Sequence, residues 1–246
     1  MLDGGRRRRA AAAAAAGLVC HAALFDDVLR ILSRCLTELE RAMTAAGVGR
    51  STTTDRASIS RFIVIIVHLL SLAARLAAAD ASDDSRRRLR AASYQLVRMN
   101  PRATDRRTPL HLAASADTTD VGRYPVARFP DAGAITTLLD AGADIDAFDA
   151  QRNTALHLAA RSRPVQADIV RLLLDRGAHP DITNSQRLNA EQLIDAAGTD
   201  GAPLYTVTSP VSHVTLQCLA SRVITRHHID YHDTLPRRLH AFIQLH

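Results

Sequence analysis

Thr108-Pro-Leu-His-Leu-Ala-Ala114 returns along the chain as Thr154-Ala-Leu-His-Leu-Ala-Ala160, and this repeated motif is the strongest indication of the fold. A second motif, Leu138-Leu-Asp-Ala-Gly-Ala-Asp144, returns 35 residues later as Leu173-Leu-Asp-Arg-Gly-Ala-His179. A degenerate third copy of the first motif begins near Asn189, again at a spacing of 35 residues. Similarity at a fixed period of this length is typical of proteins built from stacked repeats.

The residue types inside the motif predict ankyrin-type helix pairs. Thr108 and Thr154 stand where a threonine caps the first turn of a helix. Gly142 and its counterpart one repeat later end the second helix in the left-handed conformation that glycine adopts most easily. His111 and His157 are expected to bridge helix and turn by hydrogen bonds, which is a structural role rather than a catalytic one.

The spacing between the motifs also predicts an insertion. The Thr-x-Leu-His motifs lie 46 residues apart instead of 35, so the first repeat is expected to carry extra residues within 116–130. We assign the repeats to 104–198, with two clear copies and one degenerate copy. Because repeats stabilise one another through their neighbours, so short an array needs helices on both sides to cap it.

The N-terminal part predicts a helical bundle or helical-repeat segment over 22–100. Apolar periodicity and stop signals place three helices there, at Leu24–Ala46, Phe62–Ala79 and Arg86–Met99. The second of these is the most apolar run in the chain, but its strongly apolar part is too short to cross a bilayer, so a buried core helix is expected. The Arg- and Ala-rich residues 1–21 are expected to form a disordered, low-complexity leader.

The C-terminal residues 213–246 follow a predicted linker over 199–212 and are expected to form two short helices. An apolar stripe at helical spacing runs along the first of them, through Leu216, Leu219, Ala220, Val223 and Ile224. A second stripe follows Leu235-Pro236, through Leu239, Phe242 and Ile243. Two short helices bury little of their own surface, so the stripes must pack against the rest of the chain or against another protein.

Composition narrows the classes of function. A net charge of +6 and an isoelectric point near 10.0 invite a nucleic-acid role, but the Arg runs lack interleaved aromatic residues and none is expected. Three widely spaced cysteines without metal-ligand spacing favour a reducing intracellular compartment. The sequence contains no nucleophile elbow, Gly-rich phosphate loop or paired-carboxylate signature. We therefore predict an all-α protein that is not an enzyme, has no cofactor or metal site and does not bind membranes.

The two C-terminal stripes together resemble the von Hippel–Lindau box of substrate receptors for cullin-RING ubiquitin ligases. The resemblance implies an elongin-binding half followed by a cullin-binding half. The implied elongin-binding residues are Thr215, Leu216, Leu219, Ala220 and Ile224. The implied cullin-binding residues are Leu235, Pro236, Leu239 and Ile243.

From about Asp26 onward the chain resembles the C-terminal part of the feminization (Fem) family, with its B-type member as the expected counterpart. The resemblance is carried by Thr119-Asp-Val-Gly-Arg-Tyr-Pro-Val-Ala-Arg-Phe-Pro130, Leu138 to Asp146, Gly177-Ala-His179 and Thr215-Leu-Gln-Cys-Leu-Ala-Ser-Arg-Val-Ile224. It implies an adaptor that binds elongin C (with elongin B) and the second cullin paralogue, and so directs targets to ubiquitination and proteasomal degradation. The implied location is the cytoplasm or the nucleus.

One departure from the family concerns the target. The family reads C-terminal degrons with a large N-terminal ankyrin array, which this sequence lacks. A fragment, a paralogue or an incomplete gene model is therefore expected, and degron binding is carried over to no residue present.

A second hypothesis is a generic ankyrin interaction scaffold whose C-terminal helices are a structural cap. In that case the stripe of Leu216, Ala220 and Ile224 is expected to lie buried against Leu193 and Ile194. Exposure of the stripe would count against this hypothesis.

Overall fold

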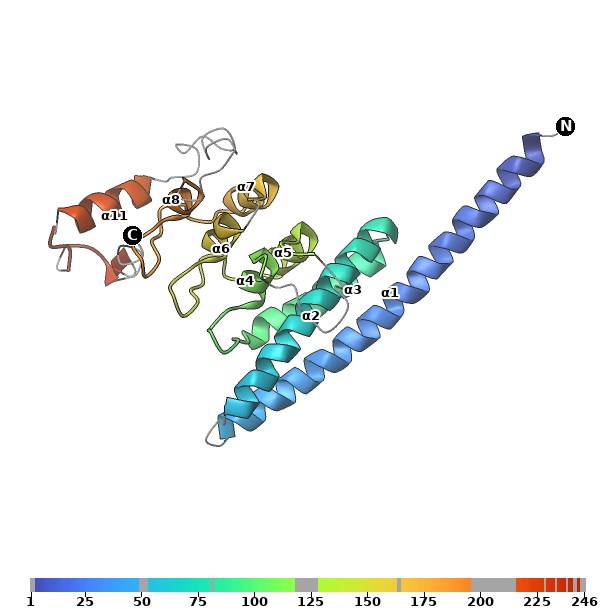
Figure 1. Cartoon of the computed structure of the whole chain (residues 1–246), viewed down its shortest axis with the longest axis horizontal. Coiled ribbons are helices and arrows are strands. Elements are labelled where there is room, and N and C mark those ends of the chain that lie inside the picture. The colour runs from blue at the N-terminus through green and yellow to red at the C-terminus, as the bar shows by residue number, and fades with distance from the viewer. Residues whose placement is uncertain are drawn as a thin grey trace.

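A computed structural model describes residues 3–48, 53–80, 82–117, 128–162, 165–195, 216–227, 229–232, 234–237, 239–240 and 243. Every regular element among these residues is an α-helix, which confirms the predicted all-α class. The helices follow one another from a long hairpin at one end to the C-terminal helix at the other (Figure 1). The predicted insertion lies partly outside the described residues, and the predicted linker over 199–212 lies wholly outside them.

Helices α1 (Asp3–Val48) and α2 (Thr53–Asp80) form the long hairpin. Their contact is apolar, because Leu32, Leu36 and Leu39 recur at helical spacing on α1 and are buried. The sequence predicts a disordered leader over 1–21, but in the structure helix α1 already begins at Asp3. Alanine and arginine are strong helix formers, so this tract prolongs the helix that packing fixes further along. Its N-terminal part extends beyond α2 and α3 (Figure 1).

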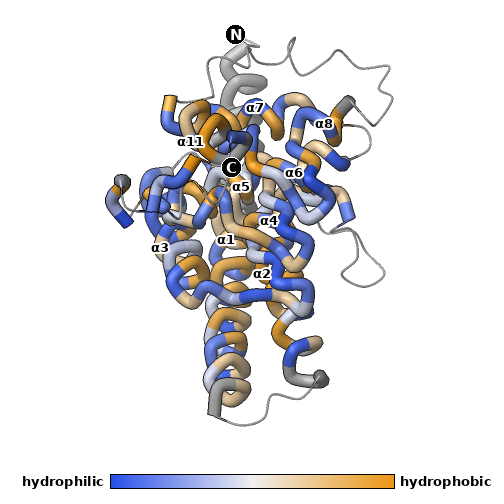
Figure 2. Tube along the Cα trace, turned by 90° about the vertical axis from the view of Figure 1, so that its left-hand side faces the viewer, coloured by the Kyte–Doolittle hydropathy of each residue, from blue (hydrophilic) through white to orange (hydrophobic). Residues whose placement is uncertain are grey.

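Helix α2 lies at the centre of the N-terminal half. By length and composition alone, its stretch Arg56–Asp80 is apolar enough to cross a membrane. In the structure half of the most apolar window is buried inside the molecule, and α2 packs against α1 and α3 as well as against the first repeat. The tube in Figure 2 shows its hydrophobic residues in orange. These contacts are those of a core helix.

Helix α3 (Asp83–Met99) has well-defined ends. The Ser82 side chain accepts a hydrogen bond from the backbone N–H of Ser85 at 3.1 Å, and Asp83 and Asp84 lie in the first turn, where negative charge is favoured. Asn100 ends the helix in the left-handed conformation. Gly142 and Gly177 end α5 and α7 in the same way, as the sequence predicts.

The repeats form two layers of short helices. One layer continues α2 with α4 (Pro109–Ala114), α6 (Ala155–Arg161) and α8 (Ala190–Asp195), and successive members from α4 onward are in contact. The other layer contains α3, α5 (Ala132–Asp140) and α7 (Ala167–Asp175), each packed against the first layer. Their arrangement can be followed in Figure 1.

A hairpin turn precedes each of α4, α6 and α8, and the three turns share one backbone conformation. Residues Arg106, Arg152 and Arg187 occupy equivalent positions in these turns, and each has a φ between 59° and 63°. A backbone hydrogen bond closes each turn; in the second it joins the N–H of Arg152 to the carbonyl of Asp149 at 3.2 Å. The first turn directly follows α3, so the α2–α3 pair stands in the place of a repeat.

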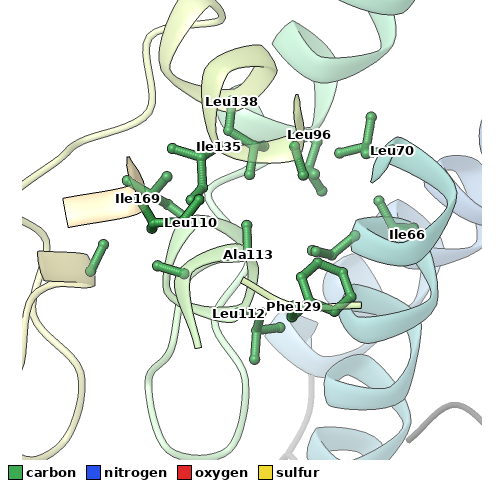
Figure 3. Packing of buried hydrophobic residues seen from close by; sticks show 14 of the residues in the cluster. Ile66, Leu70, Leu96, Leu110, Leu112, Ala113, Phe129, Ile135, Leu138 and Ile169 are labelled. Carbon is green, nitrogen blue, oxygen red and sulfur yellow. The ribbon is translucent and has the colours of Figure 1, made fainter. Parts of the chain in front are cut away.

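One hydrophobic core runs through the hairpin and the repeats. Figure 3 shows side chains of α2, α3, α4, α5 and α7 meeting within it. Leu110, Ile135 and Leu138 are among its largest fully buried members, and Leu193 and Ile194 of α8 belong to the same cluster. The array is therefore capped at its N-terminal side by α1–α3, as the short repeat number requires.

Candidate partner-binding surface

Helix α11 (Leu216–Arg226) contains the predicted elongin-binding residues, apart from Thr215, which lies outside the described residues. Leu216 is 84% exposed, Leu219 46% and Val223 51%. Ala220 is also exposed and Ile224 is half-buried. At 100° per residue these side chains share one face of the helix, so we call Leu216, Leu219, Ala220, Val223 and Ile224 the α11 stripe.

The opposite face of α11 points into the molecule. Cys218 is fully buried at 0% exposure, and Ser221 is buried with its hydroxyl donating to the carbonyl of Gln217 at 2.9 Å. The helix therefore presents its aliphatic side chains to solvent and its smaller, more polar side chains to the interior. This is the reverse of the usual arrangement of an amphipathic surface helix.

The predicted cullin-binding residues are less accessible. Pro236 is exposed and Leu235 and Leu239 are half-buried, whereas Ile243 is buried at 4% exposure. A helical turn begins here, because the N–H of Leu239 donates to the carbonyl of Pro236 at 2.8 Å. Three of the four side chains thus present some surface, and the fourth is enclosed by the chain itself.

Sequence reasoning missed an aromatic cluster between the two halves. The rings of Tyr231, His232 and His240 lie within 5.2 Å of one another, centroid to centroid. Nε2 of His240 lies 3.0 Å from the carbonyl oxygen of Leu235, and the N–H of Leu235 donates to the carbonyl of Tyr231 at 3.0 Å. The cluster therefore holds the Leu235-Pro236 turn in place. No local motif predicts it, because its members are brought together by the fold of the turn.

The histidines of the repeats have structural partners. Backbone N–H groups donate to Nδ1 of His111 and of His157, both at 3.2 Å, from the threonine three residues earlier. Burial lowers the pKa of both histidines, so they are neutral near pH 7. Among the described residues no group of three or more His, Cys, Asp or Glu side chains could hold a metal ion. The structural role predicted for these two histidines agrees with the geometry.

Comparison with known proteins gives one match to a family model. The model described as "Ankyrin repeats (3 copies)" matches residues 76–184. The range begins inside α2 and ends before α8, whereas we predicted repeats over 104–198. The repeated hairpin turn after α3 accounts for the N-terminal shift, since α2 and α3 stand in the place of a repeat.

Three curated relatives are similar along nearly the whole chain. "Protein fem-1 homolog A" of Danio rerio is 38% identical over 94% of this chain and 35% of its own length. "Protein fem-1 homolog C" of Xenopus laevis is 34% identical over the same shares. "Protein fem-1 homolog A" of Homo sapiens is 36% identical over 90% of this chain and 31% of its own length. The chain thus spans about a third of the length of these relatives, and the expected B type is not among the three.

Proposed function

We infer the function of this chain from one premise: it is homologous to the Fem-1 proteins and carries ankyrin repeats. Ankyrin repeats support a protein-interaction or adaptor role rather than a catalytic one. We propose the finer assignment that the chain is a substrate-receptor subunit of a cullin-RING ubiquitin ligase. Its α11 stripe would bind elongin C, and the following turn would bind a cullin.

The observation that carries the proposal is the exposure of the α11 stripe. Leu216 is the most exposed large apolar side chain in the described part of the molecule, and Leu219 and Val223 lie beside it. Exposed aliphatic groups gathered on one helix face are typical of a surface that another protein covers. The exposure also argues against the cap hypothesis, which required this stripe to be buried against Leu193 and Ile194.

The mechanism is proximity. One surface of the receptor would hold a target, α11 would hold elongin B/C, and the Leu235-Pro236 turn would select the cullin. Ubiquitin transfer would occur on other subunits of the assembly. The buried Cys218 face would hold α11 on the molecule and fix the direction in which the α11 stripe points. The helix would then meet its partner already folded and oriented, so that little conformational entropy is lost on binding.

The test is recovery of elongin B/C by the full chain in a pull-down. We expect the wild-type chain to recover the complex and Leu216→Asp to lose it, because a carboxylate would be buried in an apolar contact. The matched control is Gln217→Asp, which adds the same charge to the same helix at an exposed position outside the stripe. Equal recovery by the wild-type chain and Leu216→Asp would remove the proposal.

One observation favours a structural role for the last turn. Ile243 is already buried by the chain itself, so its contribution to cullin binding would require this turn to move. An Ile243→Ala variant separates the two roles. Lower thermal stability with unchanged cullin recovery would assign Ile243 to the cap, and lost cullin recovery at unchanged stability would assign it to the interface.

A further inference from the structure

A groove of about 720 Å³ lies between α2, α3 and α5. Its floor is made mostly of small residues, namely Ala74, Ala77 and Ala78 from α2 and Gly133 and Thr136 from α5, together with Leu89 from α3. Its volume is within the range of pockets that hold drug-sized ligands or short peptide segments. It is separate from α11 and from the repeat turns.

The groove is bordered by arginines of α3. Arg87 and Arg90 lie three residues apart, so they project from neighbouring positions on the helix. Both are exposed, and neither is paired with a carboxylate within the described residues. Arg86 adds a third guanidinium, which lies 3.4 Å from the carboxylate of Asp83.

The carboxylates at the groove already have cationic partners. Asp83 faces Arg86, and Asp140 pairs with Arg176 of the next repeat at 2.8 Å. The charge left without a partner at this rim is therefore that of Arg87 and Arg90. Thr136 adds a half-buried hydroxyl to the lining of the groove. A ligand that matches this arrangement has carboxylates to pair with the arginines and side chains small enough to approach the Ala and Gly floor.

We propose that this groove binds an acidic protein segment with small side chains between its carboxylates. The inference goes beyond the ubiquitin-ligase assignment and does not depend on it. A peptide is favoured over a nucleic acid because no aromatic ring lines the groove among the described residues, and single-stranded nucleic acids are held largely by stacking on aromatic rings. Charge complementarity of this kind sets the partner class and speeds association.

The experiment measures fluorescence anisotropy of a labelled peptide of alternating glutamate and alanine, titrated with the full chain. We expect saturable binding that weakens between low salt and about 150 mM salt, and no binding of the matching glutamine–alanine peptide. Arg87→Gln with Arg90→Gln is expected to weaken binding about fivefold to tenfold, since two exposed ion pairs are lost. Ala78→Leu is expected to weaken it too, because the added atoms occupy the groove without changing the charge.

The matched control is Arg34→Gln with Arg98→Gln, which removes the same charge from exposed helix positions that do not line the groove. This variant should bind the acidic peptide within about twofold of the wild-type chain. An equal loss in both double variants would overturn the proposal in favour of general charge attraction. Tighter binding of an oligouridine probe with the same dependence on Arg87 and Arg90 would overturn it in favour of nucleic acid.

Discussion

Nε2 of His111 lies 2.9 Å from the carbonyl oxygen of Asn153, so a side chain of one repeat is hydrogen bonded to the backbone of the next. Because Nδ1 accepts from the N–H of Thr108, the ring proton is on Nε2 and the histidine donates across the repeat boundary. His157 repeats the arrangement towards Leu188 at 3.2 Å. The motif histidines therefore join successive repeats as well as capping their own helices.

This geometry predicts an acid-sensitive repeat stack. The folded state lowers the pKa of His111 and His157 through burial, so the unfolded state binds more protons in acid. The stability that these neutral histidines contribute is fully present above the pKa of the unfolded state, about 6.5. As the pH falls below this value, the free energy of unfolding decreases by up to about 1.4 kcal/mol per pH unit for each histidine. Urea unfolding at a series of pH values measures the loss.

A conservative variant isolates the effect. His157→Gln is expected to keep the helix cap, because Gln192 performs this role in the third repeat by accepting from the N–H of Asn189 at 3.0 Å. The variant should show a shallower fall in stability below about pH 6.5, while the exposed-residue control His227→Gln should follow the wild-type profile. A wild-type profile in His157→Gln would contradict the prediction.

A third histidine, His179, is predicted to act in the opposite direction. Nδ1 of His179 lies 2.6 Å from the Asp146 carboxylate, and this hydrogen bond raises the pKa of His179. Its contribution to stability is therefore present below about pH 6.5 and is lost as the pH rises through the folded pKa. Asp146→Asn should lower the pKa of His179 in an NMR titration. An unchanged midpoint would show that the carboxylate does not set it.

The three left-handed arginines predict an unusual stabilising substitution. A non-glycine residue at positive φ costs about 1 kcal/mol or more, and Arg187 is exposed with a φ of 60°. Arg187→Gly is therefore expected to raise the free energy of unfolding by about 1 kcal/mol. Arg34→Gly removes the same type of side chain from an exposed position in the middle of α1. It is expected to lower the free energy of unfolding by a similar amount. Thermal or urea unfolding compares the two, and destabilisation in both would refute the strain argument.

Substitutions at two leucines are predicted to separate effects on folding stability from effects on partner binding. Leu138→Ala removes a fully buried side chain and should cost about 2–5 kcal/mol of unfolding free energy. Leu216→Ala removes an exposed one and should change stability by less than about 0.5 kcal/mol. If the proposed function holds, Leu216→Ala nevertheless weakens elongin B/C recovery. Marked destabilisation by Leu216→Ala would instead place Leu216 inside the folded core.

Much of the repeat architecture could be predicted because its signals are local. The Thr-x-x-His cap forms within one helical turn, and the left-handed ends at Gly142 and Gly177 depend on a single residue type. The leader was harder to predict. Its low complexity suggested disorder, but the same Ala and Arg residues favour a helix once α1 is nucleated by its packing on α2. No sequence motif marks α2 and α3 as members of the repeat stack.

Helical periodicity is a property of the local backbone, so the residue pattern is enough to show which side chains of the C-terminal helix share a face. Which of the two faces is covered depends on how the helix packs in three dimensions. On α11, Cys218 is buried while Leu216 faces solvent. Ile243 is also buried, although its place in the sequence motif predicted an exposed contact for a partner. Burial depends on segments distant along the chain, whose positions are fixed by the packing of the whole molecule and leave no trace in a short stretch of sequence.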